Sequence, residues 1–229
     1  MKDVILEGKN LSFTYNEKDP PVIDGVNISL EKGKVVGIVG LSGSGKTTLI
    51  QVLNGLIPKR IEGSFDGSVM LKGKNFKDIE LENISREIGT VYQDPDTQII
   101  FSWVEDELAF GPENLCMDKE VILKKIEEAL KLLNIEHLRY RNPNKLSGGE
   151  KQLVVIASVL TLDVDILILD ESMSQIDEKG KELIKKGIES MKSAGKAIIM
   201  VEHDVENLSI ADEIYLLEEG KLKKFEGNL

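Results

Sequence analysis

The sequence predicts an α/β fold with a mostly parallel sheet, an antiparallel β lobe at the N-terminus and an α-helical insert. Three short, nearly all-apolar runs are typical of strands buried on both faces, as in parallel sheets: Val35–Val39, Ile166–Asp170 and Ala197–Val201. A glycine-rich turn and a helical stretch, TTLIQVLNGL, follow the first run. A strand, a tight turn and a helix in this order open an α/β unit. The 229 residues suffice for one large domain or two lobes with an extensive core.

The other elements follow from local patterns. The first 35 residues predict short strands, ILEGKNLSFTY and VIDGVNISL, before the turn EKGK. Residues 95–150 predict a helical insert, because Lys119–Asn134 has apolar residues at helical spacing before the breaker-rich RYRNPNK. Lys179–Ser193 predicts a further helix between the last two buried strands. The tail, EIYLLEEGKLKKF, alternates around EEGK and predicts a terminal hairpin.

Charge and composition exclude several classes of protein. Lys and Arg number 29 and Asp and Glu 40, which gives a net charge of −11 and argues against nucleic acid as the main ligand. A single cysteine, Cys116, can form neither an internal disulfide nor a cysteine-based zinc site, and His137 and His203 cannot alone form a metal cluster. No signal-peptide core and no apolar stretch of about 18 residues is present, so we expect a cytoplasmic protein held at a membrane only through a partner.

The strongest motif is GLSGSGKT, Gly40–Thr47, which matches the phosphate-binding pattern G-x-x-x-x-G-K-[ST]. Its glycines let the backbone curl so that several N–H groups point at one anion, and the following helix adds its dipole. Lys46 is expected to reach the β- and γ-phosphates, and the Thr47 hydroxyl to bind Mg²⁺. The alternative is a glycine-rich structural turn. The nucleotide contacts expected here are Gly40, Ser42, Gly43, Ser44, Gly45, Lys46, Thr47 and Thr48.

Two carboxylates end the apolar strand ILILDE, Ile166–Glu171. One carboxylate at the carboxyl end of a strand can hold Mg²⁺ through water, and a second can polarise an attacking water. We assign Asp170 to the metal and Glu171 to the general base. Strands often end in acidic residues, so this motif alone is weak evidence for a metal and base pair. The phosphate loop in the same chain makes the assignment strong.

A second helix start with anion-binding character lies at LSGGE, Leu146–Glu150. Ser147 and Glu150 have capping-box spacing, and Ser147, Gly148 and Gly149 would leave bare N–H groups at the helix N-terminus. An ordinary helix cap is the alternative. The spacing alone leaves open why one domain needs two such sites.

GLSGSGKTT, LSGGE, ILILDE and a later His-Asp, in this order, resemble the ATP-binding cassette (ABC) ATPases over essentially the whole chain. The resemblance implies one ABC ATPase domain over residues 1–229 that binds and hydrolyses ATP. Residues 1–94 and 151–229 would form a P-loop NTPase (RecA-like) core with the antiparallel lobe, and 95–150 a helical subdomain that carries the signature motif. It also implies a head-to-tail dimer, in which Ser147, Gly148 and Gly149 cap the γ-phosphate bound by a second cassette, either a copy or a paralogue.

The same resemblance assigns roles to further residues. Tyr15 in LSFTY would stack on adenine, and Gln93 in VYQDPDTQ would touch Mg²⁺ and the attacking water. Asp177 ends the D-loop SQID, which would cross to the second cassette, and His203 in VEHD would contact the γ-phosphate. A packed strand tyrosine, a loop glutamine and a structural histidine are the alternatives. The implied catalytic residues are Lys46, Gln93, Glu171 and His203, and the implied Mg²⁺ ligands are Thr47, Gln93 and Asp170.

The sequence departs from the family pattern at a few positions. Ser172 and Met173 stand where proline and threonine are usual, Ile176 replaces the D-loop leucine, and Leu153 replaces an arginine. None of these changes removes a phosphate-handling group.

The stretch VYQDPDTQIIFSWVEDELAFGPENL, Val91–Leu115, resembles the ATPases of energy-coupling factor transporters and their cobalt and nickel relatives, which import vitamins or transition-metal ions. This implies a peripheral protein at the cytoplasmic face of the membrane, with a transmembrane coupling protein and a small substrate-capture membrane protein as partners. The segment after Gln93 would line the groove for the coupling helices, whose basic residues would suit Asp94, Asp96, Glu105 and Glu107. Members usually continue past the terminal strand, whereas this sequence stops at FEGNL; either it is shortened, or the dimer relies on ATP and the membrane partner.

Three other functions remain open from the sequence. One is a generic ABC importer or exporter. Another is an ABC ATPase that acts on nucleic acid or the ribosome, against which the single cassette without a long insertion or basic patch argues. The third is a non-catalytic subunit, against which the presence of Lys46, Asp170, Glu171 and His203 argues. The transported substrate is not encoded here, because another chain selects it.

Overall fold

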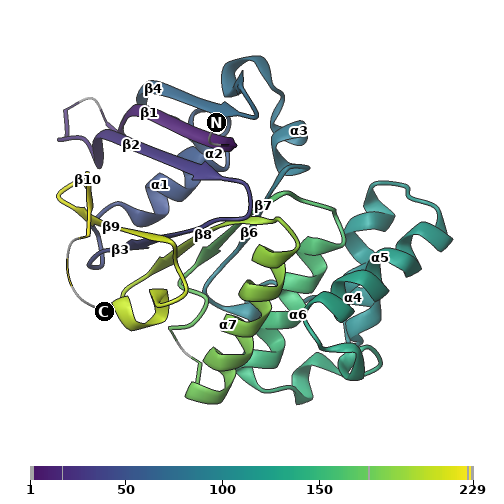
Figure 1. The fold of residues 1–229 in the computed structure, drawn as a ribbon. Coiled ribbons are helices and arrows are strands. Elements are labelled where there is room, and N and C mark those ends of the chain that lie inside the picture. The colour runs from purple at the N-terminus through teal and green to yellow at the C-terminus, as the bar shows by residue number, and fades with distance from the viewer. Residues whose placement is uncertain (1–2, 17, 175, 226, 228–229) are drawn as a thin grey trace.

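Two sheets and a set of helices form the computed structural model, which describes residues 3–16, 18–174, 176–225 and 227 (Figure 1). The core sheet has six strands in the order β10-β9-β3-β8-β7-β6, and the second sheet has four in the order β2-β1-β4-β5. Strands β3, β6, β7, β8 and β9 are parallel, and β10 is antiparallel to β9. The α/β fold with an antiparallel lobe is therefore confirmed. The core-sheet strands are β3 (Val35–Val39), β6 (Ile88–Val91), β7 (Ile166–Asp170), β8 (Ala197–Glu202), β9 (Glu213–Glu218) and β10 (Lys221–Lys224).

The antiparallel lobe consists of β1 (Val4–Thr14), β2 (Ile23–Glu31), β4 (Ser64–Leu71) and β5 (Lys74–Asn75). Strand β1 pairs with β2 on one side and with β4 on the other, and it bulges between Lys9 and Ser12. Gly67 of β4 passes this bulge with φ +101°, where a Cβ atom would lie 2.5 Å from the Asn10 carbonyl oxygen. Only glycine fits this crossing, and this glycine also interrupts the alternation by which a strand is predicted.

Helices cover the core sheet on both faces (Figure 1). Helix α1 lies between the two sheets, and α6 and α7 pack on the opposite face with α4 and α5 beyond them. The helices are α1 (Lys46–Leu53), α2 (Leu56–Lys59), α3 (Leu81–Ser85), α4 (Val104–Asn114), α5 (Lys119–Leu132), α6 (Gly148–Leu160) and α7 (Glu178–Ser193). The predicted subdomain boundary at residue 150 falls inside helix α6. The division of the chain at that residue stays a prediction.

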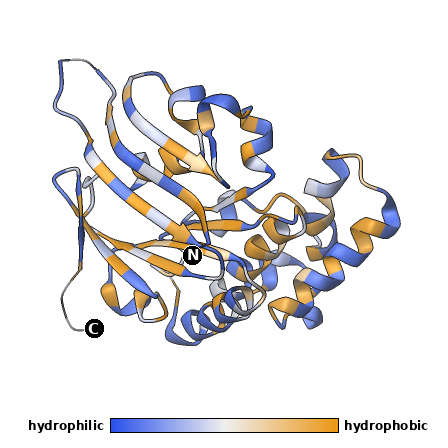
Figure 2. Cartoon of the chain, turned by 45° about the horizontal axis from the view of Figure 1, so that its top comes forward, coloured by the Kyte–Doolittle hydropathy of each residue, from blue (hydrophilic) through white to orange (hydrophobic). Residues whose placement is uncertain are grey.

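Alternate residues of the buried strands fill two separate hydrophobic clusters, because successive side chains point to opposite faces of a sheet. In β7, Leu167 and Leu169 pack in the cluster with α4–α7, whereas Ile166 and Ile168 pack with α1 and the antiparallel lobe. Hydrophobic residues accordingly dominate the core strands, while the outer helices alternate between hydrophobic and hydrophilic residues (Figure 2). The continuous apolar runs in the sequence are thus strands with two buried faces.

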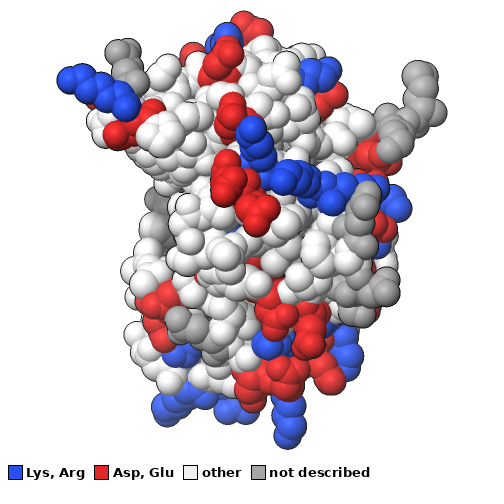
Figure 3. Space-filling view, turned by 90° about the vertical axis from the view of Figure 1, so that its left-hand side faces the viewer, with Lys and Arg blue, Asp and Glu red and all other residues white. Residues whose placement is uncertain are grey.

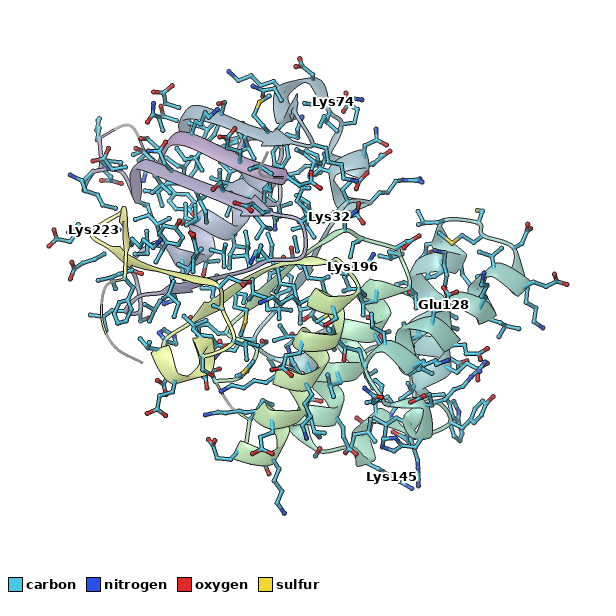
Figure 4. All side chains as sticks on the ribbon, viewed as in Figure 1. Lys32, Lys74, Glu128, Lys145, Lys196 and Lys223 are labelled. Carbon is cyan, nitrogen blue, oxygen red and sulfur yellow. The ribbon has the colours of Figure 1, made fainter. Side chains whose placement is uncertain are left out.

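Charged residues join the antiparallel lobe to the core. Lys72, in the β4–β5 turn, pairs with Glu87 and with Asp165, and Lys196 lies 3.7 Å from Asp165. The hydrogen bond from Lys72 is the largest cause that lowers the pKa of Asp165, and Lys32 adds to it. Lys32 and Lys196 lie near one another at this junction (Figure 4). Elsewhere, basic and acidic side chains are interspersed on the face that Figure 3 shows, instead of forming one continuous basic patch.

The terminal hairpin β9–β10 is confirmed, and its outer strand carries three lysines. Lys221, Lys223 and Lys224 lie within 3.9 Å of acidic side chains. Charged edge strands discourage further strand pairing. No helix within the described ranges is long and apolar enough to span a membrane.

Candidate functional site

The phosphate loop connects β3 to α1 at the carboxyl edge of the core sheet. Gly45 has φ +101°, and a Cβ atom there would lie 2.7 Å from the Val22 carbonyl oxygen. The buried Lys46 side chain curls back, and its Nζ donates to the carbonyl oxygens of Gly40 (2.8 Å) and Leu41 (3.1 Å). A cavity of about 220 Å³ is bounded by the loop and α1, with Glu171 on its far side. The arrangement suits a polyphosphate, since backbone N–H groups and one lysine surround a single cavity. It is lined by Val22, Ser42, Gly43, Gly45, Lys46, Thr47, Thr48 and Glu171.

Three of the residues predicted to be catalytic converge beside this cavity. Glu171 Oε2 lies 2.8 Å from His203 Nε2, and Glu171 Oε1 lies 3.4 Å from Lys46 Nζ. Lys46 Nζ is also 3.3 Å from His203 Nδ1. The carboxylate is therefore oriented from both sides, as a general base for water should be. Because the strands β7 and β8 are adjacent and parallel, their carboxyl ends bring Glu171 and His203 together.

Glu171 has φ +51°, a left-handed conformation that is uncommon for a non-glycine residue. Its N–H donates to the Val201 carbonyl oxygen at 2.8 Å, which continues the β7–β8 ladder by one bond. Strained backbone of this kind persists where surrounding structure over-determines it, and it clusters at functional sites. The conformation turns the chain sharply at the end of β7.

The predicted Mg²⁺ ligands present oxygen donors of the kind that this ion prefers. Thr47 is exposed at the cavity, and Asp170 is buried at the end of β7. Burial, and next the charge of Glu171, raise the pKa of Asp170 to about 6, while Lys46 and His203 oppose the shift. The described residues hold no group of three or more His, Cys, Asp or Glu side chains fit for a metal. Mg²⁺ commonly keeps several water ligands and binds through one or two carboxylates together with substrate phosphates.

Gln93 contacts the turn that follows Glu171. It is exposed, and its Nε2 donates to Ser174 Oγ at 3.0 Å, at the start of the D-loop. Its predicted contact with the metal and water stays a prediction. Gln175, within the predicted D-loop, lies outside the described residues.

The predicted adenine contact, Tyr15, rests on the first turn of α1. Its hydroxyl is 3.1 Å from Thr48 Oγ1 and donates to Gln51 Oε1 at 3.3 Å. The ring packs edge-on against Phe13 and remains 46% exposed. A wider cleft of about 620 Å³ adjoins the outer side of the phosphate loop, lined in part by Pro21, Leu41 and Leu217. Stacking on adenine stays a prediction for Tyr15.

The LSGGE segment forms the capping box that the spacing predicts. Ser147 Oγ accepts from the Glu150 N–H (3.3 Å), and the Ser147 N–H donates to Glu150 Oε2 (2.8 Å). At Gly149 a Cβ atom would lie 2.5 Å from Gly180 Cα, so α6 and α7 touch here. Asp177, the N-cap of α7, accepts from the Gly180 N–H. Within the described part of the chain, no hydrogen bond or ion pair joins Ser147, Gly148 or Gly149 to the phosphate loop of the same molecule.

Of the four acidic residues expected to face a membrane partner, Glu107 does not, while the expectation for Asp94, Asp96 and Glu105 stays a prediction. Glu107 is buried, and its Oε2 accepts from the N–H groups of Ile100 (2.8 Å) and Phe101 (2.9 Å). Glu105 holds Arg139 with both carboxylate oxygens, at 3.0 and 3.2 Å.

The other two acidic residues also have partners within the chain. Asp96 pairs with Lys151 at 2.6 Å, and Asp94 accepts from the Asp96 N–H. The same region also exposes apolar side chains, namely Tyr92, Ile100, Trp103 and Phe110.

Sequence patterns missed the contacts that join the segment after Gln93 to α6. Lys151, next to the signature motif, pairs with Asp96, and Gln152 Nε2 donates to the Tyr92 carbonyl oxygen at 3.3 Å. The only signal was the polar pair Lys151-Gln152 at the start of an otherwise apolar helix. These bonds connect the exposed apolar surface to the signature helix.

Sequence patterns also did not point to Glu202. It ends β8, is 1% exposed, and burial raises its pKa to about 7 despite hydrogen bonds from Met173 and Asn207. The signal was a carboxylate directly after the apolar run AIIMV.

This pKa has a consequence for stability. Because the folded state binds the proton of Glu202 more tightly than the unfolded state, the associated stabilisation is complete below pH 4.5 and is lost as pH rises through about 7. We therefore expect Glu202→Gln to raise the free energy of unfolding, relative to the natural chain, by about 3 kcal/mol more at pH 8 than at pH 4.5. Denaturant titrations of both chains at the two pH values test this, with the exposed Glu206→Gln as control. An equal difference at both pH values would contradict it.

A phosphate loop between β3 and α1, with a carboxylate pair at the end of β7, defines a nucleotide-binding ATPase domain. Comparison with known proteins identifies the family, since residues 23–174 match the family model described as ABC transporter. A putative ABC transporter ATP-binding protein of Methanosarcina acetivorans is 40% identical over 220 residues, which cover 95% of this chain and 34% of that protein. The chain belongs to the ABC transporter family and is an ATP-hydrolysing domain of that family.

Two relatives are similar over most of their length. The energy-coupling factor transporter ATP-binding protein EcfA of Methanosarcina acetivorans is 37% identical over 216 residues, covering 93% of this chain and 76% of that protein. The structure of cbiO1 from Clostridium perfringens, described as part of the ABC transporter complex cbiONQ, has a TM-score of 0.88 and 31% identity, covering 97% of this chain and 88% of that chain. By contrast, the chain spans only 34% to 44% of the length of seven curated relatives named as putative ABC transporter ATP-binding proteins.

Proposed function

We propose that this chain drives an energy-coupling factor type ABC importer, for vitamin or transition-metal ion uptake, by binding ATP with Mg²⁺, closing head to tail on a second cassette and hydrolysing the nucleotide. The observation that carries the catalytic part is the contact of Glu171 with His203 and Lys46 beside the phosphate loop. The similarity to EcfA and cbiO1 supports the transporter branch.

In the proposed reaction, Lys46 leaves the carbonyl oxygens of its own loop and binds the β- and γ-phosphates. Glu171 accepts a proton from water as the water oxygen attacks the γ-phosphorus, and the bond to the β-phosphate oxygen breaks in line. His203 orients Glu171 through the 2.8 Å contact. Thr47, Gln93 and Asp170 would hold Mg²⁺, which supplies charge neutralisation for the phosphates. The products are ADP and inorganic phosphate.

The proposed dimer accounts for the second anion-binding helix start. Ser147 and Gly148 are exposed at the N-terminus of α6. Because Glu150 Oε2 already accepts from the Ser147 N–H, we expect the Gly148 N–H and the helix dipole to meet a γ-phosphate held on another molecule.

The proposed membrane contact comprises the exposed apolar side chains of this region, Tyr92, Ile100, Trp103 and Phe110. Large exposed aromatic side chains favour protein interfaces. The buried Glu107 holds the backbone beside these side chains, since it accepts from the N–H groups of Ile100 and Phe101. The bonds from Lys151 and Gln152 would transmit movement of this surface to the signature helix.

Capture of membrane partners tests the proposal. A tagged chain is pulled from native membranes in mild detergent, and its partners are identified by mass spectrometry. We expect a polytopic coupling protein, a small substrate-capture membrane protein and a second cassette. Capture of a coupling protein alone would favour a generic ABC transporter, and capture of only soluble or ribosomal partners would contradict the transporter function.

Trp103→Asp sharpens this test. Trp103 is the N-cap of α4, a position that aspartate favours, so the helix should survive the change. We expect at least about tenfold less coupling protein in the pull-down, since a central interface aromatic is commonly worth 2 kcal/mol or more, while ATP binding by the isolated chain stays unchanged. Val121→Asp, on exposed α5, is the matched control and should capture normally. Normal capture by Trp103→Asp would remove this surface from the interface.

A further inference from the structure

We propose that Glu202 is a positioning residue for ATP hydrolysis, which holds the start of the D-loop at a fixed place relative to His203. Its side chain is 1% exposed at the end of β8. Oε1 accepts from the Met173 N–H at 3.1 Å, and Oε2 accepts from Asn207 Nδ2 at 3.3 Å. One buried carboxylate thus joins the loop after β7, the end of β8 and the 3₁₀ turn Val205–Leu208.

This bridge lies directly behind the Glu171–His203 contact. His203 follows Glu202 in sequence, and Met173 belongs to the turn that begins at Glu171, in which Ser174 N and Oγ both donate to the Glu171 carbonyl oxygen. The turn begins with the left-handed φ of Glu171. Because such a conformation must be held by its surroundings, the bond from Met173 to Glu202 supports the backbone that aims the Glu171 carboxylate.

The same turn is bonded to Gln93, at the start of the segment proposed to contact the membrane partner. Ser174 Oγ, in the same turn, accepts from Gln93 Nε2 at 3.0 Å. Displacement of this turn would therefore move the Gln93 contact and the Glu171 carboxylate together.

An apolar residue would be the simpler choice at this position. The rest of β8 is apolar and fully buried, and a buried carboxylate is costly unless it is hydrogen-bonded. Opposing charges do little for it, since Glu171 repels it and Lys181 is the cation that favours its ionised form. Polar residues at positions where the local sequence favours an apolar one concentrate at functional sites. Only an acceptor side chain can make the two hydrogen bonds from Met173 and Asn207 at this position.

The inference rests on the roles proposed for Glu171 and His203, and its test compares variants in the full chain. Glu202→Asp keeps the charge but is one methylene too short to reach both donors. Glu202→Gln keeps the full length: its Oε1 can accept from the Met173 N–H, and its Nε2 can donate to the Asn207 side-chain oxygen once that amide turns over. We expect Glu202→Asp to lower kcat for ATP hydrolysis about tenfold or more, with KM for ATP within about twofold of the natural value. Glu202→Gln should stay within about threefold in both constants.

Controls separate positioning from folding. Glu206→Asp makes the same chemical change at an exposed position of the 3₁₀ turn and should be silent. Asn207→Ala removes one donor only and should give a smaller loss of kcat at unchanged KM, which keeps the inference testable if Glu202→Asp does not fold. Thermal unfolding of each variant reports folding.

Three results would overturn the inference: unchanged kcat in Glu202→Asp and Asn207→Ala, equal losses in Glu202→Asp and Glu202→Gln, or a raised KM at unchanged kcat. Glu171→Gln distinguishes this failure from failure of the proposed site. An active Glu171→Gln chain would refute the assignment of the base, whereas an inactive Glu171→Gln beside a fully active Glu202→Asp would refute only the positioning role.

Discussion

A Glu171→Gln chain should bind ATP but hydrolyse it at least about 100-fold more slowly than the natural chain, because general-base catalysis contributes about 10²–10⁴-fold. The amide can keep a hydrogen bond to His203, so the shape of the site should be retained, but it cannot accept a proton from water. Loss of the 3.4 Å contact between Glu171 and Lys46 should matter little for ATP binding, because Lys46 then binds the phosphates of the nucleotide.

Steady-state phosphate release and binding of a fluorescent ATP analogue measure the two properties separately. Glu189→Gln, on the exposed face of α7, makes the same chemical change away from the site and should behave as the natural chain. Hydrolysis by Glu171→Gln at the natural rate would show that another group is the base.

Lys46→Ala should lower the affinity for ATP by about 10- to 100-fold, the range expected for losing charge-assisted hydrogen bonds to phosphate. The loss also has a structural origin within the chain. Lys46 Nζ lies between the carbonyl oxygens of Gly40 and Leu41 and the Glu171 carboxylate, and without it these acceptors face each other. The loop should therefore be both less attractive to phosphate and less ordered.

Equilibrium binding of ATP and ADP, each with Mg²⁺, measures this effect. Lys74→Ala is the control, since Lys74 is exposed on β5, the edge strand of the antiparallel lobe (Figure 4). Unchanged affinity in Lys46→Ala would contradict the assignment of the loop as the phosphate site.

The core strands and the phosphate loop could be predicted because their signals are local. A strand buried on both faces is continuously apolar, as Val35–Val39 and Ile166–Asp170 are, and a phosphate loop needs glycines at fixed spacing. Strand β4 was missed because Gly67 and the polar residues around it follow the bulge of β1, which is a tertiary feature.

Contacts between distant segments could not be predicted from local patterns. The acids Glu105 and Asp96 look like a solvated acidic face until their partners, 34 and 55 residues away, are known. The same applies to Glu202, whose role depends on Met173 in the neighbouring loop. Resemblance named Lys46, Glu171 and His203 individually, but only the fold shows that the three touch.

In the proposed mechanism, two cassettes complete each ATP site, one with its phosphate loop and the other with Ser147–Gly149. The most direct measurement is the molecular mass of Glu171→Gln in solution by light scattering, with ATP and Mg²⁺ or with ADP and Mg²⁺. We expect the mass of two chains with ATP and the mass of one chain with ADP. A single-chain mass with ATP bound, together with a natural hydrolysis rate per chain that does not depend on protein concentration, would contradict it.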